Sequence, residues 1–167
     1  GDTVSQLAQI KKGSKPKLAK GEKLFVLTQI TDRESPWYNG QTYLDLLNPE
    51  AVKEFIKVTH EKYKKRIGKD FGKLVPGIFT DEPNHARYLR LHWVKDCEMF
   101  APWTPALPKE FKKRYCYDIT SRLLEVFFDV VEAEDQFARY HYHDCTTSLF
   151  VEAFSKQVGE WCGSNGI

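Results

Sequence analysis

A helix with strong signals at both ends divides the first half of this sequence. Residues 48–68 read NPEAVKEFIKVTHEKYKKRIG. Asn48 can accept hydrogen bonds from the free N–H groups of a helix start, Pro49 suits the first helical position, and Gly68 suits the end. The expected buried stripe follows steps of three and four residues: Val52, Phe55, Ile56, Thr59, Tyr63 and Ile67. The sequence therefore predicts a helix over residues 48–67 with one buried face.

Two apolar runs flank this helix. KLFVLTQI, residues 23–30, and LVPGIFT, residues 74–80, are rich in β-branched, aromatic and other large apolar side chains. A weaker strand is expected over residues 4–10. The order strand, helix, strand predicts parallel pairing of the two main runs through a right-handed crossover, with the helix packed on the resulting sheet. The expected fold class is therefore α/β.

The second half of the chain has two different patterns. Residues 85–133 mix aromatic, proline and charged residues, which predicts a long irregular insertion with a short helix starting at Pro108 and another after Asp118. Residues 134–162 instead have helical periodicity. Their expected buried residues are Tyr142, Cys145, Leu149, Phe150, Ala153, Phe154, Val158 and Trp161.

The overall composition is that of a soluble globular domain. The 167 residues are 41% hydrophobic and 29% charged, and the net charge of +2 favours neither a nucleic-acid nor a membrane partner. The excess lysines near the N-terminus predict a solvated tail or hairpin, with an anionic partner as the alternative; they are Lys11, Lys12, Lys15, Lys17, Lys20 and Lys23. The four cysteines have no metal-binding or disulfide spacing, and no signal peptide is visible, so a cytoplasmic location is favoured.

Two adjacent carboxylates follow the second apolar run. Asp81 and Glu82 come directly after Thr80 and before Pro83. A strand that ends in acids carries them to the edge of its sheet, where α/β enzymes usually hold their active sites. Neighbouring strand residues point to opposite faces, so one of the two is expected to be catalytic. The alternative is a turn that Asp81 caps.

Two stretches resemble a known family. SPWYNGQTYLDLLNPEAVKEFIKVTHEKYKKRIGKDFGKLVPGIFTDEPN, residues 35–84, and FVEAFSKQVGEWCGSNGI, residues 150–167, resemble bacterial glycoside hydrolases with a TIM-barrel catalytic domain, including enzymes related to α-L-rhamnosidases. The resemblance covers roughly half of the chain and excludes the first 20 residues and residues 88–132. It implies that residues 1–167 are a single-domain fragment of a (β/α)8 barrel. The implied parts are a strand or hairpin region (1–33), a loop, helix and strand (34–84), the insertion (85–133) and a long helix (134–167).

The resemblance also implies a chemistry. Glu82 corresponds to the acid that protonates the glycosidic oxygen. The better-known retaining clan has Asn before this acid, whereas this sequence has Asp81, so retention and inversion both stay open. Hydrolysis needs a second carboxyl group. Asp32 is a modest candidate, and the resemblance places the partner on a later strand, so the isolated chain is expected to hydrolyse no glycoside appreciably. No cofactor is implied, and the implied partners are a carbohydrate and the remaining barrel segments.

Several other residues are candidates for contacts with a sugar. Trp37, Tyr38 and Asn39 lie in a turn-forming loop, where the two rings can stack on a sugar or pack against the protein. Asn84 and His85 follow the acids and have hydrogen-bonding groups for hydroxyls. A non-catalytic carbohydrate-binding or protein-interaction module is the alternative function.

A second polar cluster, RYHYHDC, suggests a metal only at first sight. His141, His143 and Asp144 are ligand types for zinc or iron. On a helix, however, positions two apart are separated by about 200°, so the two imidazoles do not share a face. No metal site is expected.

Overall fold

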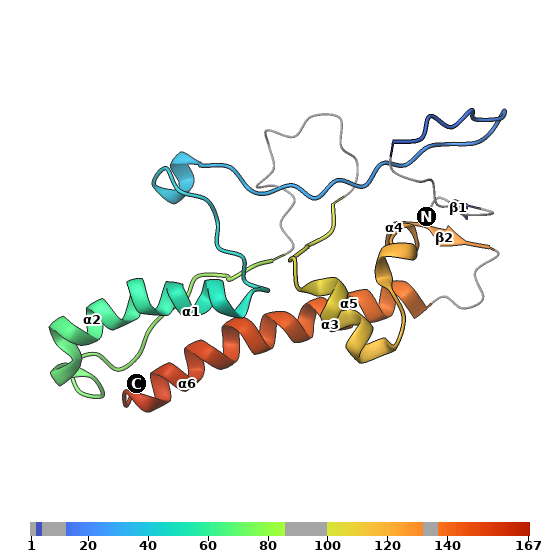
Figure 1. The fold of residues 1–167 in the computed structure, drawn as a ribbon. Coiled ribbons are helices and arrows are strands. Elements are labelled where there is room, and N and C mark those ends of the chain that lie inside the picture. The colour runs from blue at the N-terminus through green and yellow to red at the C-terminus, as the bar shows by residue number, and fades with distance from the viewer. Residues whose placement is uncertain (1–2, 5–12, 86–99, 132–136) are drawn as a thin grey trace.

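One long helix organises the fold. The computed structural model describes residues 3–4, 13–85, 100–131 and 137–167. Its elements in chain order are β1 (Thr3–Val4), the 3₁₀ helix η1 (Pro36–Tyr38), α1 (Pro49–Val58), α2 (His60–Ile67), the 3₁₀ helix η2 (Gly68–Asp70), α3 (Leu107–Tyr115), the 3₁₀ helix η4 (Ile119–Ser121), α4 (Leu124–Phe127), β2 (Asp129–Val130), α5 (Phe137–Phe150), the π-helix η5 (Val151–Lys156) and α6 (Gln157–Ser164). The last three are continuous, and the shorter helices lie along them (Figure 1).

Two hydrophobic clusters follow one another along this long helix. The first holds α3 and α4 against α5 and contains Leu47, Leu107, Phe111, Ile119, Val126, Ala138, Tyr142, Cys145 and Leu149. The second holds α1 against η5 and α6 and contains Leu46, Val52, Ile56, Ala153 and Phe154. Phe150 packs against both clusters. The predicted helix is thus confirmed over residues 137–162, and residues 134–136 lie outside the described residues.

The predicted first helix exists, but it is divided. The Asn48 side chain accepts hydrogen bonds from the N–H groups of Glu50 and Ala51, as expected of the cap. The helix is interrupted at Thr59, where ψ is −71°, and continues as α2. The buried stripe therefore holds for Val52 and Ile56 but not for Tyr63, which is 60% exposed. The stripe packs on the long helix and not on a sheet.

The predicted α/β fold class is wrong. Neither residues 23–30 nor residues 74–80 form a strand, and the side chains of Val26 and Phe79 are 77% and 87% exposed. The described sheet consists of β1 and β2 alone, two-residue strands that pair in parallel. The two runs have the composition of strands, but the part of the chain that the structure describes has no neighbouring strand for them to pair with. The described residues contain no part of a barrel.

Some later predictions hold. α3 begins at Leu107 with Pro108 in its first turn, and Asp118 caps η4 by accepting a hydrogen bond from the N–H of Thr120. The weak strand expected over residues 4–10 falls mainly outside the described residues, and only β1 touches it. The division of the chain into parts of a larger domain stays a prediction.

Candidate functional site

The two predicted catalytic carboxylates lie on an extended segment and not at a strand end. Asp81 and Glu82 are both exposed, and residues 76–84 form neither helix nor strand. Glu82 has φ = +41°, in the left-handed region that non-glycine residues rarely adopt. The geometric reason for placing them at the edge of a sheet is therefore lost, while their role stays a prediction.

The predicted aromatic loop is a well-defined turn. Ser35 Oγ accepts a hydrogen bond of 3.2 Å from the N–H of Trp37, and Asn39 closes the turn in the left-handed region with φ = +54°. Trp37 is 84% exposed, whereas the Tyr38 ring lies 5.2 Å from the ring of Tyr43. In this loop, the Trp37 ring is therefore exposed to solvent, whereas the Tyr38 ring packs against Tyr43.

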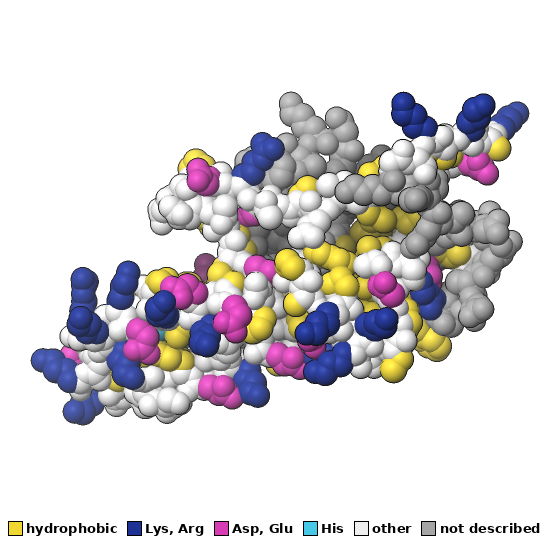
Figure 2. Space-filling model, in the orientation of Figure 1, with side chains coloured by type: hydrophobic (Ala, Val, Ile, Leu, Met, Phe, Trp, Pro, Cys, Tyr) yellow, Lys and Arg dark blue, Asp and Glu magenta, His cyan; other side chains and the backbone are white. Residues whose placement is uncertain are grey.

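A groove of about 580 Å³ lies beside the predicted site residues. We call it the Asp32 groove, and the lining residues used below are Asp32, Tyr43, Asp45, Asn48, His85 and Trp103. Three segments and His85 form it; the segments are residues 29–32, residues 42–48 and residues 102–105. Figure 2 shows apolar side chains gathered below the extended N-terminal segment, between it and the helices. Two predicted residues, Asp32 and His85, are thus brought to one site.

Asp45 fixes the wall of the groove. Its Oδ1 accepts a hydrogen bond of 3.0 Å from the N–H of Leu47, and its Oδ2 accepts one of 2.7 Å from Thr104 Oγ1. Thr104 is fully buried, so this carboxylate joins the chain before α1 to the chain before α3. Both oxygens have protein partners, and we assign Asp45 a positioning role.

Asp32 is the groove carboxylate that can still accept hydrogen bonds from a ligand. Its Oδ1 accepts a hydrogen bond of 2.8 Å from the N–H of Arg33, and its other oxygen has no partner within the described parts of the chain. The side chain is half-buried at the groove. A carboxylate oxygen can accept two hydrogen bonds, so Asp32 can bind a hydroxyl or amide donor of a ligand.

His85 and Asn84 connect the predicted acids to the groove. The backbone N–H of Asn84 donates a hydrogen bond of 3.2 Å to Tyr43 Oη. The His85 ring lies 5.0 Å from the ring of Phe150 and is half-buried. These contacts hold the end of the 81–85 segment against the groove wall and the long helix.

Sequence reasoning missed Tyr43 and Asp45. Asp45 had a local signal, because Asp often starts a turn and lies here three residues before the Asn48 cap. Its carbonyl does accept a turn hydrogen bond of 3.2 Å from the N–H of Asn48. Tyr43 had no comparable signal, since the residue that donates a hydrogen bond to its hydroxyl, Asn84, is 41 positions away in the sequence.

The His141 cluster is a packing feature between α3 and α5. The His141 ring stacks on Tyr115 at 4.2 Å, and its Nδ1 lies 3.1 Å from Tyr117 Oη. Tyr115 donates its hydroxyl hydrogen to Asp144. Burial, and then this hydrogen bond, raise the pKa of the Tyr115 phenol. Within residues 3–4, 13–85, 100–131 and 137–167, no group of three or more His, Cys, Asp or Glu side chains is arranged to hold a metal.

Comparison with known proteins identifies no family for this chain. No protein-family model, curated protein or solved structure matches the chain. None of the helices in the described residues has the length and apolar character to cross a membrane.

Proposed function

We propose that the chain binds a carbohydrate in the Asp32 groove as part of a glycoside hydrolase. One observation carries the proposal: the groove combines the rings of Tyr43 and Trp103 with the spare carboxylate oxygen of Asp32. Sugar rings have apolar faces that pack on aromatic rings and hydroxyls that donate to carboxylates. The volume of about 580 Å³ is in the range of small-molecule sites.

The proposed acid lies close to this groove along the chain. His85 lines the groove, and Glu82 precedes it by three residues. An extended chain advances at most about 3.6 Å per residue, so the two Cα atoms lie within about 11 Å of each other. In this proposal Glu82 protonates the leaving oxygen of a glycoside whose sugar ring occupies the groove. The second carboxyl group that hydrolysis needs is Asp32 or a residue outside this chain.

A non-catalytic carbohydrate-binding module is the second candidate. It is favoured by the exposure of Asp81 and Glu82, because a general acid active at neutral pH needs a setting that raises its pKa. Both candidates share the groove and differ in the need for Glu82.

The test is a titration of the chain with a panel of neutral oligosaccharides, followed by calorimetry or by NMR shift changes. We expect binding, and we expect Asp32→Asn to weaken it at least tenfold, since a carboxylate is a stronger acceptor than an amide. Asp81→Asn is the matched control, because Asp81 lies outside the groove lining. Loss of binding in Asp81→Asn with none in Asp32→Asn would contradict the groove assignment.

Trp103 and Trp37, two of the four tryptophans, give a second matched pair. Trp103 lines the groove, whereas Trp37 is the exposed ring of the predicted loop. We expect Trp103→Phe to weaken sugar binding and Trp37→Phe to leave it unchanged. The opposite result would locate the sugar at residues 37–39 and not in the groove.

A further inference from the structure

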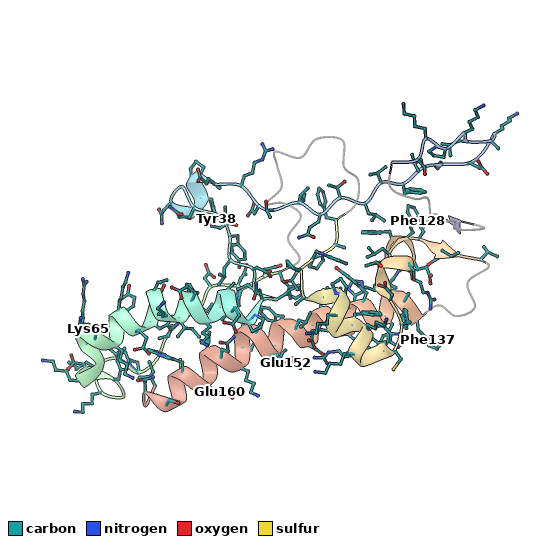
Figure 3. All side chains as sticks on the ribbon, in the orientation of Figure 1. Tyr38, Lys65, Phe128, Phe137, Glu152 and Glu160 are labelled. Carbon is teal, nitrogen blue, oxygen red and sulfur yellow. The ribbon has the colours of Figure 1, made fainter. Side chains whose placement is uncertain are left out.

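We infer that the end of the molecule formed by α2 and η2 binds an acidic polysaccharide. This inference rests on the proposed function for the choice of a polysaccharide. Six cationic side chains, which we call the basic end, lie in residues 60–73: Lys62, Lys64, Lys65, Arg66, Lys69 and Lys73. Figure 2 shows Lys and Arg gathered at this end, and Figure 3 shows Lys65 at the outer side of α2, away from the extended segment.

The basic end concentrates charge that the whole chain does not have. Residues 60–73 contain six cations against two carboxylates, Glu61 and Asp70, a net +4 with His60 neutral, whereas the whole chain has +2. All six cations are exposed. None of them forms an ion pair with any residue that the structure describes. Glu61 is already used, since it accepts a hydrogen bond from Trp161 Nε1.

Helix stability explains only part of this charge. Lys64, Lys65 and Arg66 lie in the last turn of α2, where cations interact favourably with the helix dipole. Lys69 lies in η2, and Lys73 lies in the turn after it. Lys69 extends the positive surface into the last turn of η2, and Lys73, which lies outside both helices, extends it beyond the helix end.

The ligand that fits is an extended polyanion and not a single ion. Each exposed cation gives a weak contact in water, so one small anion gains little. Several contacts to one polymer act together and release its condensed counterions. At a rise of 1.5 Å per residue, the cations from Lys62 to Lys69 span roughly 10 Å.

Residues 60–73 favour a polysaccharide over a lipid surface or a nucleic acid. Tyr63 and Ile67 are the large apolar side chains of α2, which leaves the helix without the wide apolar face that interfacial insertion requires. Tyr63, 60% exposed, is the single exposed aromatic ring of this stretch, all of which the structure describes. Single-stranded nucleic acids use a series of stacking rings. One ring among cations suits one sugar unit of an acidic chain.

The test measures binding of the chain to polygalacturonate, with fully methyl-esterified polygalacturonate as the uncharged polymer control. At low salt we expect binding to the acidic polymer alone, weakening steeply as salt is added. Lys65→Glu with Arg66→Glu should weaken it about tenfold. Lys15→Glu with Lys17→Glu is the matched control. It changes the net charge by the same amount as the first double variant, at exposed positions that are distant in the sequence from residues 60–73.

Three results would overturn the inference. They are absence of binding at low salt, equal loss in the two double variants, and tighter binding to single-stranded DNA or to anionic phospholipid vesicles of equal charge concentration. The groove is tested separately, by the titration with neutral oligosaccharides described above. A chain that binds the acidic polymer but no neutral oligosaccharide would reject the groove proposal and keep the basic end as a polyanion site.

Discussion

The indole N–H of Trp161 donates a hydrogen bond of 2.6 Å to a carboxylate oxygen of Glu61, 100 residues earlier in the sequence. This bond holds α6 against α2 at the C-terminal end of the long helix. Beside it, the His60 ring lies edge-on between two aromatic rings, 5.1 Å from Trp161 and 5.2 Å from Phe55. His60 is 5% exposed, and its Nδ1 has no hydrogen-bond partner in the described structure.

The first prediction concerns pH and His60. Burial disfavours the imidazolium, so the pKa of His60 lies below its ordinary value of 6.5. As pH falls through 6.5, the unfolded chain binds this proton before the folded one does, and the free energy of unfolding decreases. The decrease stops below the folded pKa, and between the two pKa values it is about 1.4 kcal/mol per pH unit. Chemical denaturation from pH 8 to pH 5 measures it.

His60→Phe is the control for this prediction. Phenylalanine keeps an aromatic ring between Phe55 and Trp161 but cannot bind a proton. The variant should have a shallower dependence of stability on pH over the same range. Identical pH profiles for the two proteins would show that His60 does not contribute.

The second prediction concerns the start of α1. Asn48→Ala removes the acceptor for the N–H groups of Glu50 and Ala51, at 3.1 and 3.4 Å. Loss of such a cap typically costs about 1 kcal/mol, so the free energy of unfolding in urea should decrease by that amount. Asn48→Asp keeps an acceptor oxygen and should lose little. If Asp and Ala destabilise equally, the cap is not what Asn48 contributes.

The cap shows what can be predicted from sequence here. Asn48, Pro49 and the periodicity of residues 134–162 are local signals, and each one identifies a helix present in the structure. The prediction for Tyr63 was wrong because one uninterrupted helix was assumed, whereas the helix is interrupted at Thr59.

The strand predictions failed for a different reason. A helix satisfies its own backbone hydrogen bonds, whereas a strand needs a neighbour that the local sequence does not specify. Residues 23–30 have the right composition, yet Val26 faces solvent. For the same reason only part of the groove could be predicted from the sequence. The Asp45–Thr104 hydrogen bond in its wall joins residues 59 positions apart. Asp32 and His85 were identified, but not the wall between them.

The third prediction separates two cysteines by reactivity. Cys145 is fully buried, and burial raises the pKa of its thiol to about 11. Cys116 is exposed at the end of α3. The thiolate is the reactive form, so iodoacetamide at pH 7.5 should modify Cys116 readily and Cys145 only after denaturation. Peptide mass spectrometry reads each site separately. Equal labelling of both in the native protein would contradict the burial of Cys145.

The fourth prediction concerns turnover. Hydrolysis of a glycoside needs two carboxyl groups across the cleaved bond. Glu82 is exposed, and its proposed second acid is either Asp32 or outside this chain, so we expect the chain alone to release no measurable phenol from aryl glycosides. Activity lost in Glu82→Gln and kept in Asp81→Asn would show that this chain has both acids. General acid catalysis typically contributes about 10²- to 10⁴-fold, which sets the sensitivity that the assay needs.

Phe150 has a consequence for how the molecule unfolds. Because its ring packs against both hydrophobic clusters, neither cluster can be exposed to water without removing part of the other's packing. The α1 half and the α3–α4 half are therefore expected to melt as one cooperative unit, with one thermal transition for probes in either half. Truncating this ring to alanine should separate the transition into two, which native-state hydrogen exchange would resolve as different opening free energies for α1 and α3.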